Sequence, residues 1–445
     1  MNLKSIHNIF FIGIGGIGMS AIARYFVANG KNVAGYDKTP SGIISELESL
    51  GALVHFEDTI ASIPISFLNK ETTLIIYTPA IPKNHKQFNY FLSHGFSILK
   101  RSEILGKITE HTFCLAVAGT HGKTTTSAIL GHIMAAVNAT SFLGGIAENY
   151  NSNLILGDDK VSVVEADEFD RSFLKLSPNI ACITSTDADH LDIYGDSAAL
   201  EVSFNDFSTI VSDTLIVAKG LNFKGLTYAI DEDADYVASN LKIESGRYIF
   251  DVKTPTSTIS NIEFHLPGRH NVMNALAALA MADVYGLSLE KVKQRLISFK
   301  GVKRRFSYKI KTDNFVLIDD YAHHPTAINA VESSVREMYP NQKVLVVFQP
   351  HLFSRTRDFI DDFASSLSNF DEVLLLDIYP ARELPIKGVN SEWLLDKVTC
   401  AHKKMTKKNI LAKDIKNSSA KIVVMLGAGD IGVLVNEVTE TILKQ

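Results

Sequence analysis

The stretch Val117-Ala-Gly-Thr-His-Gly-Lys-Thr-Thr-Thr126 decides the fold that we expect around it. The apolar run 113–117 before it is typical of a buried strand, and residues 127–134 after it predict a helix. A strand, a glycine-containing turn, Lys-Thr and a helix form a cradle for nucleotide phosphates, in which Lys123 adds charge and Thr124 can hold Mg²⁺. Val117 stands where the usual pattern has its first glycine, and an ordinary helix start is the alternative interpretation.

The composition is typical of a soluble protein with several domains. The chain has 445 residues, enough for two to four domains, with 46% hydrophobic and 21% charged residues. A net charge of -5 gives no overall attraction to nucleic acid or to an anionic membrane. No signal-peptide core or membrane-span pattern is present, so we expect a cytoplasmic protein. The three cysteines, far apart in the sequence, are expected to be thiols rather than disulfides or metal ligands.

A second glycine motif, Gly13-Ile-Gly-Gly-Ile-Gly18, follows a predicted apolar strand, 8–12, and precedes a helical pattern. The next predicted strand, 32–36, ends at Asp37, which completes a dinucleotide-binding fingerprint. We expect Gly13, Gly15, Gly16 and Gly18 to hold a nucleotide diphosphate and Asp37 to accept a ribose hydroxyl, without specifying NAD. A purely structural glycine turn is the alternative. Thr78 follows the predicted strand 73–77, at an end where open α/β sheets bind ligands.

Two predicted strands in the middle of the chain end in acidic residues. Residues 161–170 end in four carboxylates that include Glu165, and strand 180–184 is followed by Asp187, Asp189, His190 and Asp192. Carboxylates at strand ends beside a phosphate loop predict a Mg²⁺ site, and His190 could hold a second ion or orient a phosphate. Solvated acidic loops are the alternative.

Further polar residues precede an Ala-rich helical run, 275–281. Asn271 and Asn274 lie where asparagine commonly caps a helix, and with Arg269 and His270 they also suggest a polar pocket. In the last third, apolar strands end in polar residues near Asp320, His351, Asp377 and Gly427. This repetition predicts a doubly wound sheet with a site along its C-terminal edge.

The motifs, taken together in this order, resemble those of the Mur ligases of peptidoglycan synthesis over nearly the whole chain. The resemblance rests on at least eight separate motifs, including Phe11–Ser20, Gly119–Thr126, Val164–Glu168, Asp189–Asp192, Gly268–Asn274, Gly301–Phe306, Asp319–Pro325 and Gly427–Ile431. It implies a three-domain α/β fold. These domains are a UDP-sugar-binding Rossmann-like domain (1–107), a central P-loop-type ATPase domain (108–302) and a Rossmann-like amino-acid-binding domain (303–445).

The resemblance also implies a reaction, and it is strongest to the branch of the family that adds L-alanine. We therefore expect an ATP- and Mg²⁺-dependent ligase that joins L-alanine to the lactyl carboxylate of UDP-N-acetylmuramate through an acyl phosphate. ADP and phosphate would be released. The expected partners are these small molecules, with no nucleic acid and no membrane, and the chain is expected to be a monomer or homodimer.

Roles for individual residues follow from the same resemblance. The ATP site is implied to consist of Gly119, Thr120, His121, Gly122, Lys123, Thr124, Thr125, Asn271, Asn274 and Arg305. Mg²⁺ ligands are implied at Thr124, Glu165 and His190, and catalytic roles at Lys123, Glu165, His190, Arg305 and Asp320. The UDP substrate is implied to contact the glycine motif, Asp37, Thr78 and His121. The amino acid is implied to contact Tyr321, His323 and Arg355.

Some positions depart from the family pattern, and other functions stay open. Leu352 stands where an arginine is usual, with Arg357 as a possible replacement, and Ser185 stands for an asparagine. Residues 202–206 contain no lysine, in agreement with the alanine-adding branch. The nearest alternative is a ligase that recycles murein tripeptide. A nicotinamide-dependent oxidoreductase would leave Lys123, Glu165 and His190 without a role, and a non-catalytic regulator would not need metal ligands at two strand ends.

Overall fold

The first sheet is built from five parallel strands in the order β3-β2-β1-β4-β5. The structure is a computed structural model that describes residues 5–187, 197–244, 246–381 and 383–444. The strands are β1 (Asn8–Ile12), β2 (Asn32–Tyr36), β3 (Leu53–His55), β4 (Thr73–Tyr77) and β5 (Ser97–Lys100). The helices are α1 (Ile17–Ala28), α2 (Gly42–Ser49), α3 (Lys86–Ser93) and α4 (Arg101–Thr109).

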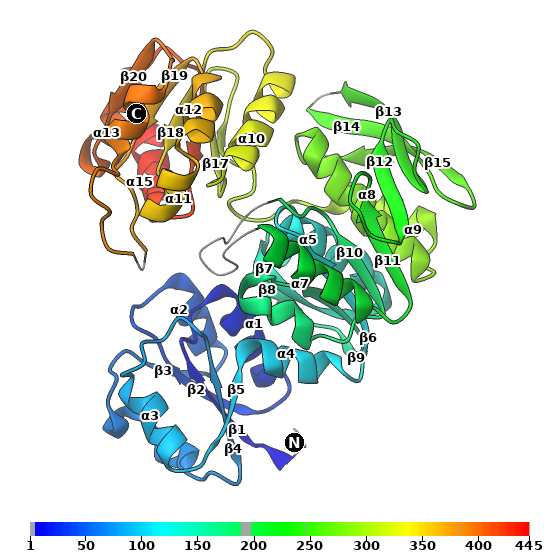
Figure 1. The fold of residues 1–445 in the computed structure, drawn as a ribbon, viewed down its shortest axis with the longest axis vertical. Helices are drawn as coiled ribbons and strands as arrows, with labels where there is room; N and C mark the ends of the chain where they lie inside the picture. The colour runs from blue at the N-terminus through cyan, green and yellow to red at the C-terminus, as the bar shows by residue number, and fades with distance from the viewer. Residues whose placement is uncertain (1–4, 188–196, 245, 382, 445) are drawn as a thin grey trace. The chain divides into compact units, whose positions relative to one another are not determined.

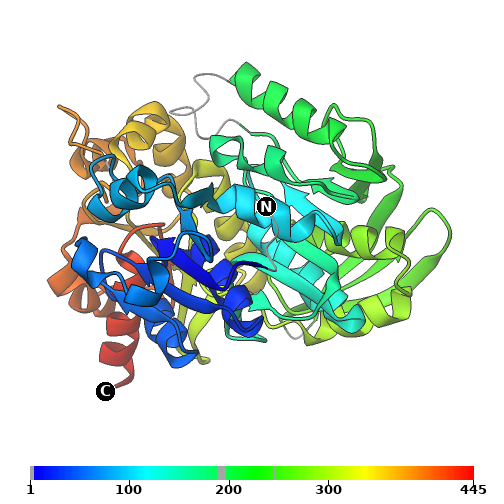
Figure 2. The ribbon, with the colours of Figure 1, turned by 90° about the horizontal axis from the view of Figure 1, so that it is seen from below.

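Both faces of this first sheet are covered, because apolar residues of β1 point to both sides. Ile9 and Phe11 belong to an apolar cluster with α1, whereas Phe10 and Ile12 belong to another cluster with Phe91 of α3. Figures 1 and 2 show the blue elements of this sheet and its helices from two directions. The chain leaves β1 toward β2 on one side and has β4 on the other, so the Gly13–Gly18 turn lies at the switch point where such sheets bind ligands.

A ten-stranded sheet follows, in the order β15-β14-β13-β12-β11-β10-β6-β9-β7-β8. Its strands are β6 (Phe113–Ala118), β7 (Ala139–Ala147), β8 (Ser152–Ile155), β9 (Asp158–Glu165), β10 (Ile180–Ile183), β11 (Thr214–Ala218), β12 (Leu226–Ile230), β13 (Tyr236–Glu244), β14 (Arg247–Lys253) and β15 (Thr258–Phe264). The associated helices are α5 (Lys123–Met134), α7 (Ser197–Thr209), α8 (Arg269–Val284) and α9 (Leu289–Ser298). Strand β6 lies between β9 and β10 and is parallel to both.

The third sheet has six strands, in the order β16-β17-β21-β18-β19-β20, with only β16 antiparallel to its neighbour. Its strands are β16 (Ser307–Lys311), β17 (Val316–Asp320), β18 (Val344–Phe348), β19 (Glu372–Leu375), β20 (His402–Met405) and β21 (Ile422–Leu426). Its helices are α10 (Pro325–Met338), α11 (Phe353–Asp358), α12 (Ile360–Ser368), α13 (Ser391–Lys397), α14 (Leu411–Lys416) and α15 (Ile431–Leu443).

Alternate residues of these buried strands face opposite layers of helices. Ile318 of β17 packs in one apolar cluster with residues of α10, α12 and α13, and Leu317 packs in another with residues of α14 and α15. This is the doubly wound arrangement that the sequence predicts for the last third of the chain.

Contacts divide the chain into two compact units. One comprises Met1–Leu241, Phe250–Glu263 and Met273–Lys300, and the other comprises Lys242–Ile249, Phe264–Val272 and Gly301–Gln445. The predicted domain boundaries after residues 107 and 302 remain predictions. None of the helices in the described part of the chain has the length and apolarity that a membrane span requires.

Candidate active site

The phosphate loop joins β6 to α5 and turns at two glycines. Gly119 has a φ of 133° and Gly122, the residue before α5, a φ of 82°, which are values that side-chain-bearing residues rarely adopt. A Cβ on Gly119 would also overlap the hydroxyl of Thr184, which follows β10. Because glycine has no side chain, these two residues do not cover the backbone N–H groups at the N-terminus of α5, as an anion-binding loop requires.

Residues after β10 brace this loop. The Ser185 hydroxyl accepts a hydrogen bond from the His121 backbone N–H at 2.8 Å and lies 2.9 Å from Thr120 Oγ1. The Ser185 backbone carbonyl accepts the Thr120 N–H at 3.0 Å. His121 Nε2 lies 3.3 Å from Asp187 Oδ2. Ser185, noted in the sequence only as a departure from the family pattern, is thus part of the loop's support.

Lys123, the first residue of α5, forms a buried ion pair with Glu168. Its Nζ lies 2.9 Å from Oε1 and 2.7 Å from Oε2 of Glu168, which has no solvent exposure, and also donates to the Gly119 carbonyl. Burial lowers the pKa of Lys123, but the carboxylates of Glu168, Asp167 and Glu165 together raise that pKa above its ordinary value. Lys123 is therefore a cation in a strongly negative setting, and sequence reasoning did not identify its partner.

Glu165 ends β9 beside the phosphate loop, since its register partner in β6 is Val117. Its carboxylate accepts the Thr124 hydroxyl at 3.1 Å and the Gly144 N–H at 3.0 Å. A Cβ on Gly144 would overlap this carboxylate, so Gly144 makes room for it. The structure thus brings together Thr124 and Glu165, two of the three predicted metal ligands. The third, His190, lies outside the described residues.

The donor set around Thr124 is suited to Mg²⁺ because it consists of a hydroxyl and a carboxylate oxygen, which are hard ligands. Within the residues that the structure describes, no group of three or more His, Cys, Asp or Glu has the arrangement of a complete metal site. Phosphate and water oxygens normally complete the shell of a nucleotide-bound Mg²⁺, so two protein ligands fit such an ion.

The two predicted adenine-site asparagines lie inside α8 and do not cap it, because this helix begins at Arg269. Asn274 Oδ1 accepts the Thr126 hydroxyl at 3.1 Å and lies over Gly122, where a Cβ would approach it to 2.6 Å. Asn274 therefore lies beside the phosphate loop. Thr125, in the first turn of α5, is buried. Asn271 Nδ2 donates to the Pro267 carbonyl at 2.6 Å.

The first glycine motif forms a turn stabilised by Asp37. Gly13 has a φ of 87°, and a Cβ there would lie 2.6 Å from the Thr78 methyl group. The turn after β1 therefore packs against the residue that follows β4. Asp37 Oδ2 accepts the Gly15 N–H at 2.8 Å and Oδ1 accepts the Lys38 N–H at 2.7 Å. The turn ends at Gly16 and Gly18, at the start of α1. Asp37 thus shapes the turn, a role that the sequence did not predict.

In the third sheet, Asp320 is a buried carboxylate bound by backbone. It accepts the N–H groups of Phe306 and Ala322, each at 2.7 Å. Burial raises the pKa of Asp320 above its ordinary value, although Arg305 and these two donors act in the opposite direction. Asp320 therefore holds the turn that carries Arg305 against the end of β17.

Aromatic and basic side chains gather after β17. The guanidinium of Arg305 lies 5.1 Å from the centre of the Tyr321 ring, and that ring lies 5.1 Å from the His323 ring. His351, after β18, is the next ring, 6.0 Å from His323. Tyr321 and His323, both predicted to meet the amino acid, are thus neighbours at the C-terminal edge of the sheet.

Arg355 lies buried in the short helix α11, three residues after the unusual Leu352. Leu352 is itself buried and has a φ of 72°, a conformation that is strained for a leucine. Arg357 is exposed, and its Nε lies 2.7 Å from Asp358 Oδ1. Arg357 therefore pairs with its neighbour in the sequence.

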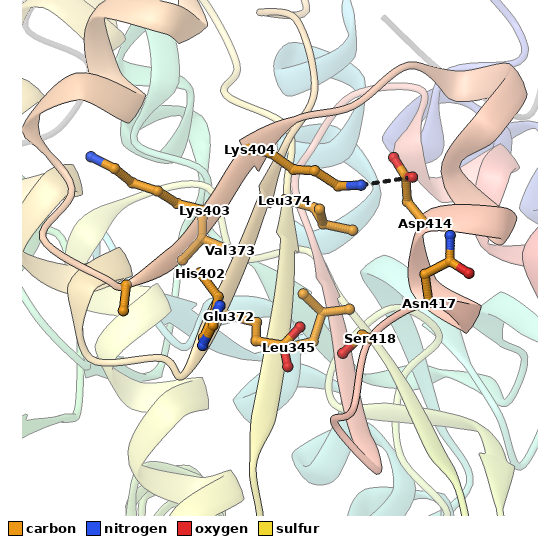
Figure 3. A pocket seen from close by; sticks show the side chains of 11 residues that line it. Leu345, Glu372, Val373, Leu374, His402, Lys403, Lys404, Asp414, Asn417 and Ser418 are labelled. Atoms are coloured by element: carbon orange, nitrogen blue, oxygen red, sulfur yellow. Dashed lines mark hydrogen bonds and ion pairs between the residues drawn. The ribbon is translucent and has the colours of Figure 1, made fainter.

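A shallow cavity of about 300 Å³ lies elsewhere, near the start of β18, β19 and β20 (Figure 3). Its lining runs along most of the two short strands β19 and β20, from Glu372 to Leu374 and from His402 to Lys404. Lys404 on its wall pairs with Asp414 at 2.8 Å. The cavity contains none of the predicted site residues.

Comparisons with known proteins match this chain from end to end. Three family models match successive parts of the chain. They are the Mur ligase family, catalytic domain, at residues 8–112, the Mur ligase middle domain at 117–282, and the Mur ligase, glutamate ligase domain at 304–435. A UDP-N-acetylmuramate–L-alanine ligase of Flavobacterium psychrophilum is 62% identical over 98% of both chains. Another, of Christiangramia forsetii, is 58% identical over 100% of this chain and 99% of its own.

Solved structures agree with these matches. The crystal structure of a UDP-N-acetylmuramate-alanine ligase from Thermotoga maritima has a TM-score of 0.83 at 27% identity, covering 98% of this chain and 99% of its own. A murein peptide ligase from Psychrobacter arcticus has a TM-score of 0.71 at 21% identity, with 98% of each chain covered, and shares the fold.

Proposed function

This chain belongs to the Mur ligase family, and on that premise we propose that it joins L-alanine to the lactyl carboxylate of UDP-N-acetylmuramate, with conversion of ATP to ADP and phosphate. The observation that carries an ATP-dependent reaction is the loop that sets Lys123 and the Thr124–Glu165 pair at the N-terminus of α5. The names of the 62% and 58% identical relatives support the choice of substrates. A cytoplasmic enzyme, monomeric or homodimeric, is part of the same proposal.

The proposed reaction has two chemical steps. A lactyl carboxylate oxygen attacks the γ-phosphorus of ATP, ADP leaves, and an acyl phosphate forms. The alanine amine then attacks the acyl carbon, phosphate leaves, and the nitrogen loses a proton to give the amide. ATP is needed because a carboxylate is a poor electrophile until one of its oxygens is converted into a leaving group.

Lys123 is proposed to stabilise the charge that grows on the phosphates during transfer, as a cation at a helix N-terminus does. Gly119, Thr120, His121, Gly122 and Thr125 are proposed to form the rest of the phosphate cradle. Mg²⁺ would be held by Thr124 and Glu165, with the predicted His190 at a second ion, and it would neutralise phosphate charge when bound.

The remaining residues are proposed to bind the ends of the substrates. Asn271 and Asn274 would contact adenine, while Arg305, held in place by the Asp320 turn, would contact ATP. Tyr321, His323 and Arg355 would surround the amino acid, with Arg355 on its carboxylate. The glycine turn (Gly13, Gly15, Gly16, Gly18), Asp37, Thr78 and His121 would bind the UDP substrate. The switch-point position of this turn supports its assignment.

One assay tests the proposal against its alternatives. Purified protein is supplied with ATP, Mg²⁺ and UDP-N-acetylmuramate, and phosphate release is measured with L-alanine, L-serine, glycine or murein tripeptide. We expect release that depends on the amino acid and is fastest with L-alanine. Faster release with tripeptide would make the protein a recycling ligase. No release with any amine, under conditions where ATP binds, would reject the ligase function and favour a regulator.

A further inference from the structure

A short acidic turn after β9 lies between the two glycine-containing turns. Asp167 accepts a hydrogen bond from Arg101 Nη2 at 2.8 Å, and Arg101 is the first residue of α4. The guanidinium of Arg101 lies directly against Gly18 in the first turn of α1, where a Cβ would overlap it. Asp167 is therefore tied, through one side chain, to the turn proposed to hold the UDP diphosphate.

The next residue in the chain, Glu168, is tied to the other site. Both of its carboxylate oxygens face Lys123 Nζ, at 2.9 and 2.7 Å, and the side chain is fully buried. One arginine, two consecutive carboxylates and one lysine thus form a continuous path from Gly18 to the phosphate loop.

The backbone of this turn depends on such anchors. Asp167 Oδ1 accepts the Phe169 N–H at 3.1 Å, and the Asp167 carbonyl accepts the Phe173 N–H at 2.9 Å. Asp170 and Arg171 have φ values of 54° and 53°, which are unfavourable for residues with a side chain. Because the turn contains no glycine to relieve this strain, the position of Glu168 depends on how its neighbour Asp167 is held.

We propose that Arg101 and Asp167 are positioning residues that couple the UDP-substrate site to the ATP site by fixing Glu168 and, through it, Lys123. The inference rests on the proposed function, because it takes the glycine turn as the diphosphate site and the Gly119–Thr126 loop as the ATP site. A diphosphate on the first turn of α1 would lie beside the guanidinium that holds Asp167. Diphosphate binding would thus change how Glu168 is held against Lys123, and the binding of ATP would have the reciprocal effect on the diphosphate site.

The test measures this coupling without turnover. Calorimetry gives the Kd of a non-hydrolysable ATP analogue, with Mg²⁺, in the absence and presence of saturating UDP-N-acetylmuramate. We expect the two Kd values of the wild-type protein to differ by roughly fivefold or more. In Asp167→Asn the difference should fall below about twofold, and Arg101→Met should behave alike. Arg101→Lys, which keeps the charge, should retain part of it.

A neighbouring ion pair provides a matched control. Lys100 Nζ lies 3.2 Å from Asp170 Oδ2, so it joins the same two segments one residue away from Arg101, and both side chains are about 40% exposed. Lys100→Met should keep the wild-type coupling. Because Asp167→Asn could unfold the turn, its thermal unfolding is compared with that of Lys100→Met, and Arg101→Met provides a second measurement.

The outcomes separate this inference from the proposed function. Wild-type coupling that persists in both Asp167→Asn and Arg101→Met, or equal loss in Lys100→Met, would overturn the inference and leave the ligase function standing. Amino-acid-dependent phosphate release with no coupling in the wild type would do the same. Absence of such release would reject the function on its own, since the calorimetry requires binding only.

Discussion

Replacing Lys123 by Met should destabilise the phosphate-loop region by about 3–5 kcal/mol, because it leaves the Glu168 carboxylate buried without its cation. Glu168 has no exposed surface and Lys123 is 13% exposed, so water cannot take over the lost interaction. Loss of the hydrogen bond to the Gly119 carbonyl adds about 1 kcal/mol. The double variant Lys123→Met/Glu168→Gln removes the unpaired charge and should recover most of this loss.

The assay must report on the loop, because a chain with several domains need not unfold in one step. Fluorescence is unsuitable, since the only tryptophan is Trp393, in the third sheet's domain. Hydrogen exchange of α5 peptides in nucleotide-free protein reports the opening of this helix directly. A loss of 3 kcal/mol corresponds to roughly 150-fold faster exchange where exchange follows local opening.

Two results would refute this reasoning. If α5 exchanges as slowly in Lys123→Met as in the wild type, the ion pair is not formed in the free protein. If the double variant is as unstable as the single one, the damage comes from lost packing of the lysine stem and not from the unpaired carboxylate. Lys123→Met should also abolish turnover while keeping UDP-substrate binding, and loss of that binding would contradict the domain assignment.

Gly144→Ala should push the Glu165 carboxylate aside and raise the Mg²⁺ concentration for half-maximal phosphate release about 10-fold or more; an unchanged requirement would remove Glu165 from the metal site. Asp320→Ala should leave two backbone N–H groups unpaired and cost about 2–5 kcal/mol in urea unfolding, against about half for Asp320→Asn. Burial and Arg295 lower the pKa of His132 to about 4, so its stabilising effect is present above pH 6.5 and is lost as the pH falls toward 4. Between pH 7 and pH 5 the wild type should lose about 2 kcal/mol more than His132→Gln.

Much of the sheet architecture could be predicted because buried parallel strands have short apolar runs with abrupt ends. The predicted strands 8–12, 32–36 and 73–77 coincide with β1, β2 and β4. Polar residues after such runs also predict a ligand-binding edge, and this part of the interpretation stays a prediction. Strand β13 was not predicted, since Tyr236–Glu244 mixes buried and exposed residues without a clear apolar run.

The candidate site could be predicted only in part, because several of its contacts depend on backbone turns. Four carboxylates lie at the end of β9 and directly after it, and their order in the sequence does not reveal which one meets Lys123. The positive φ values of Asp170 and Arg171 help shape the turn in which Glu168 faces the lysine while Glu165 faces Thr124. Similarly, α8 begins at Arg269, directly after Gly268 with its φ of 94°. Asn271 and Asn274 therefore lie within the helix and not at the cap position that the sequence suggests.

The Lys123–Glu168 pair has a consequence for how the protein selects its nucleotide. The lysine of the free protein already holds a tethered anion, so an incoming phosphate group must displace a competitor that never diffuses away. A ligand that offers a single weak contact, such as inorganic phosphate, gains little from this exchange. A nucleoside triphosphate that engages the loop amides, the proposed Mg²⁺ and the proposed adenine-binding residues together would outcompete the tethered carboxylate. The buried glutamate would thereby favour ligands that make several contacts over those that make one, and it would also weaken the binding of ATP itself.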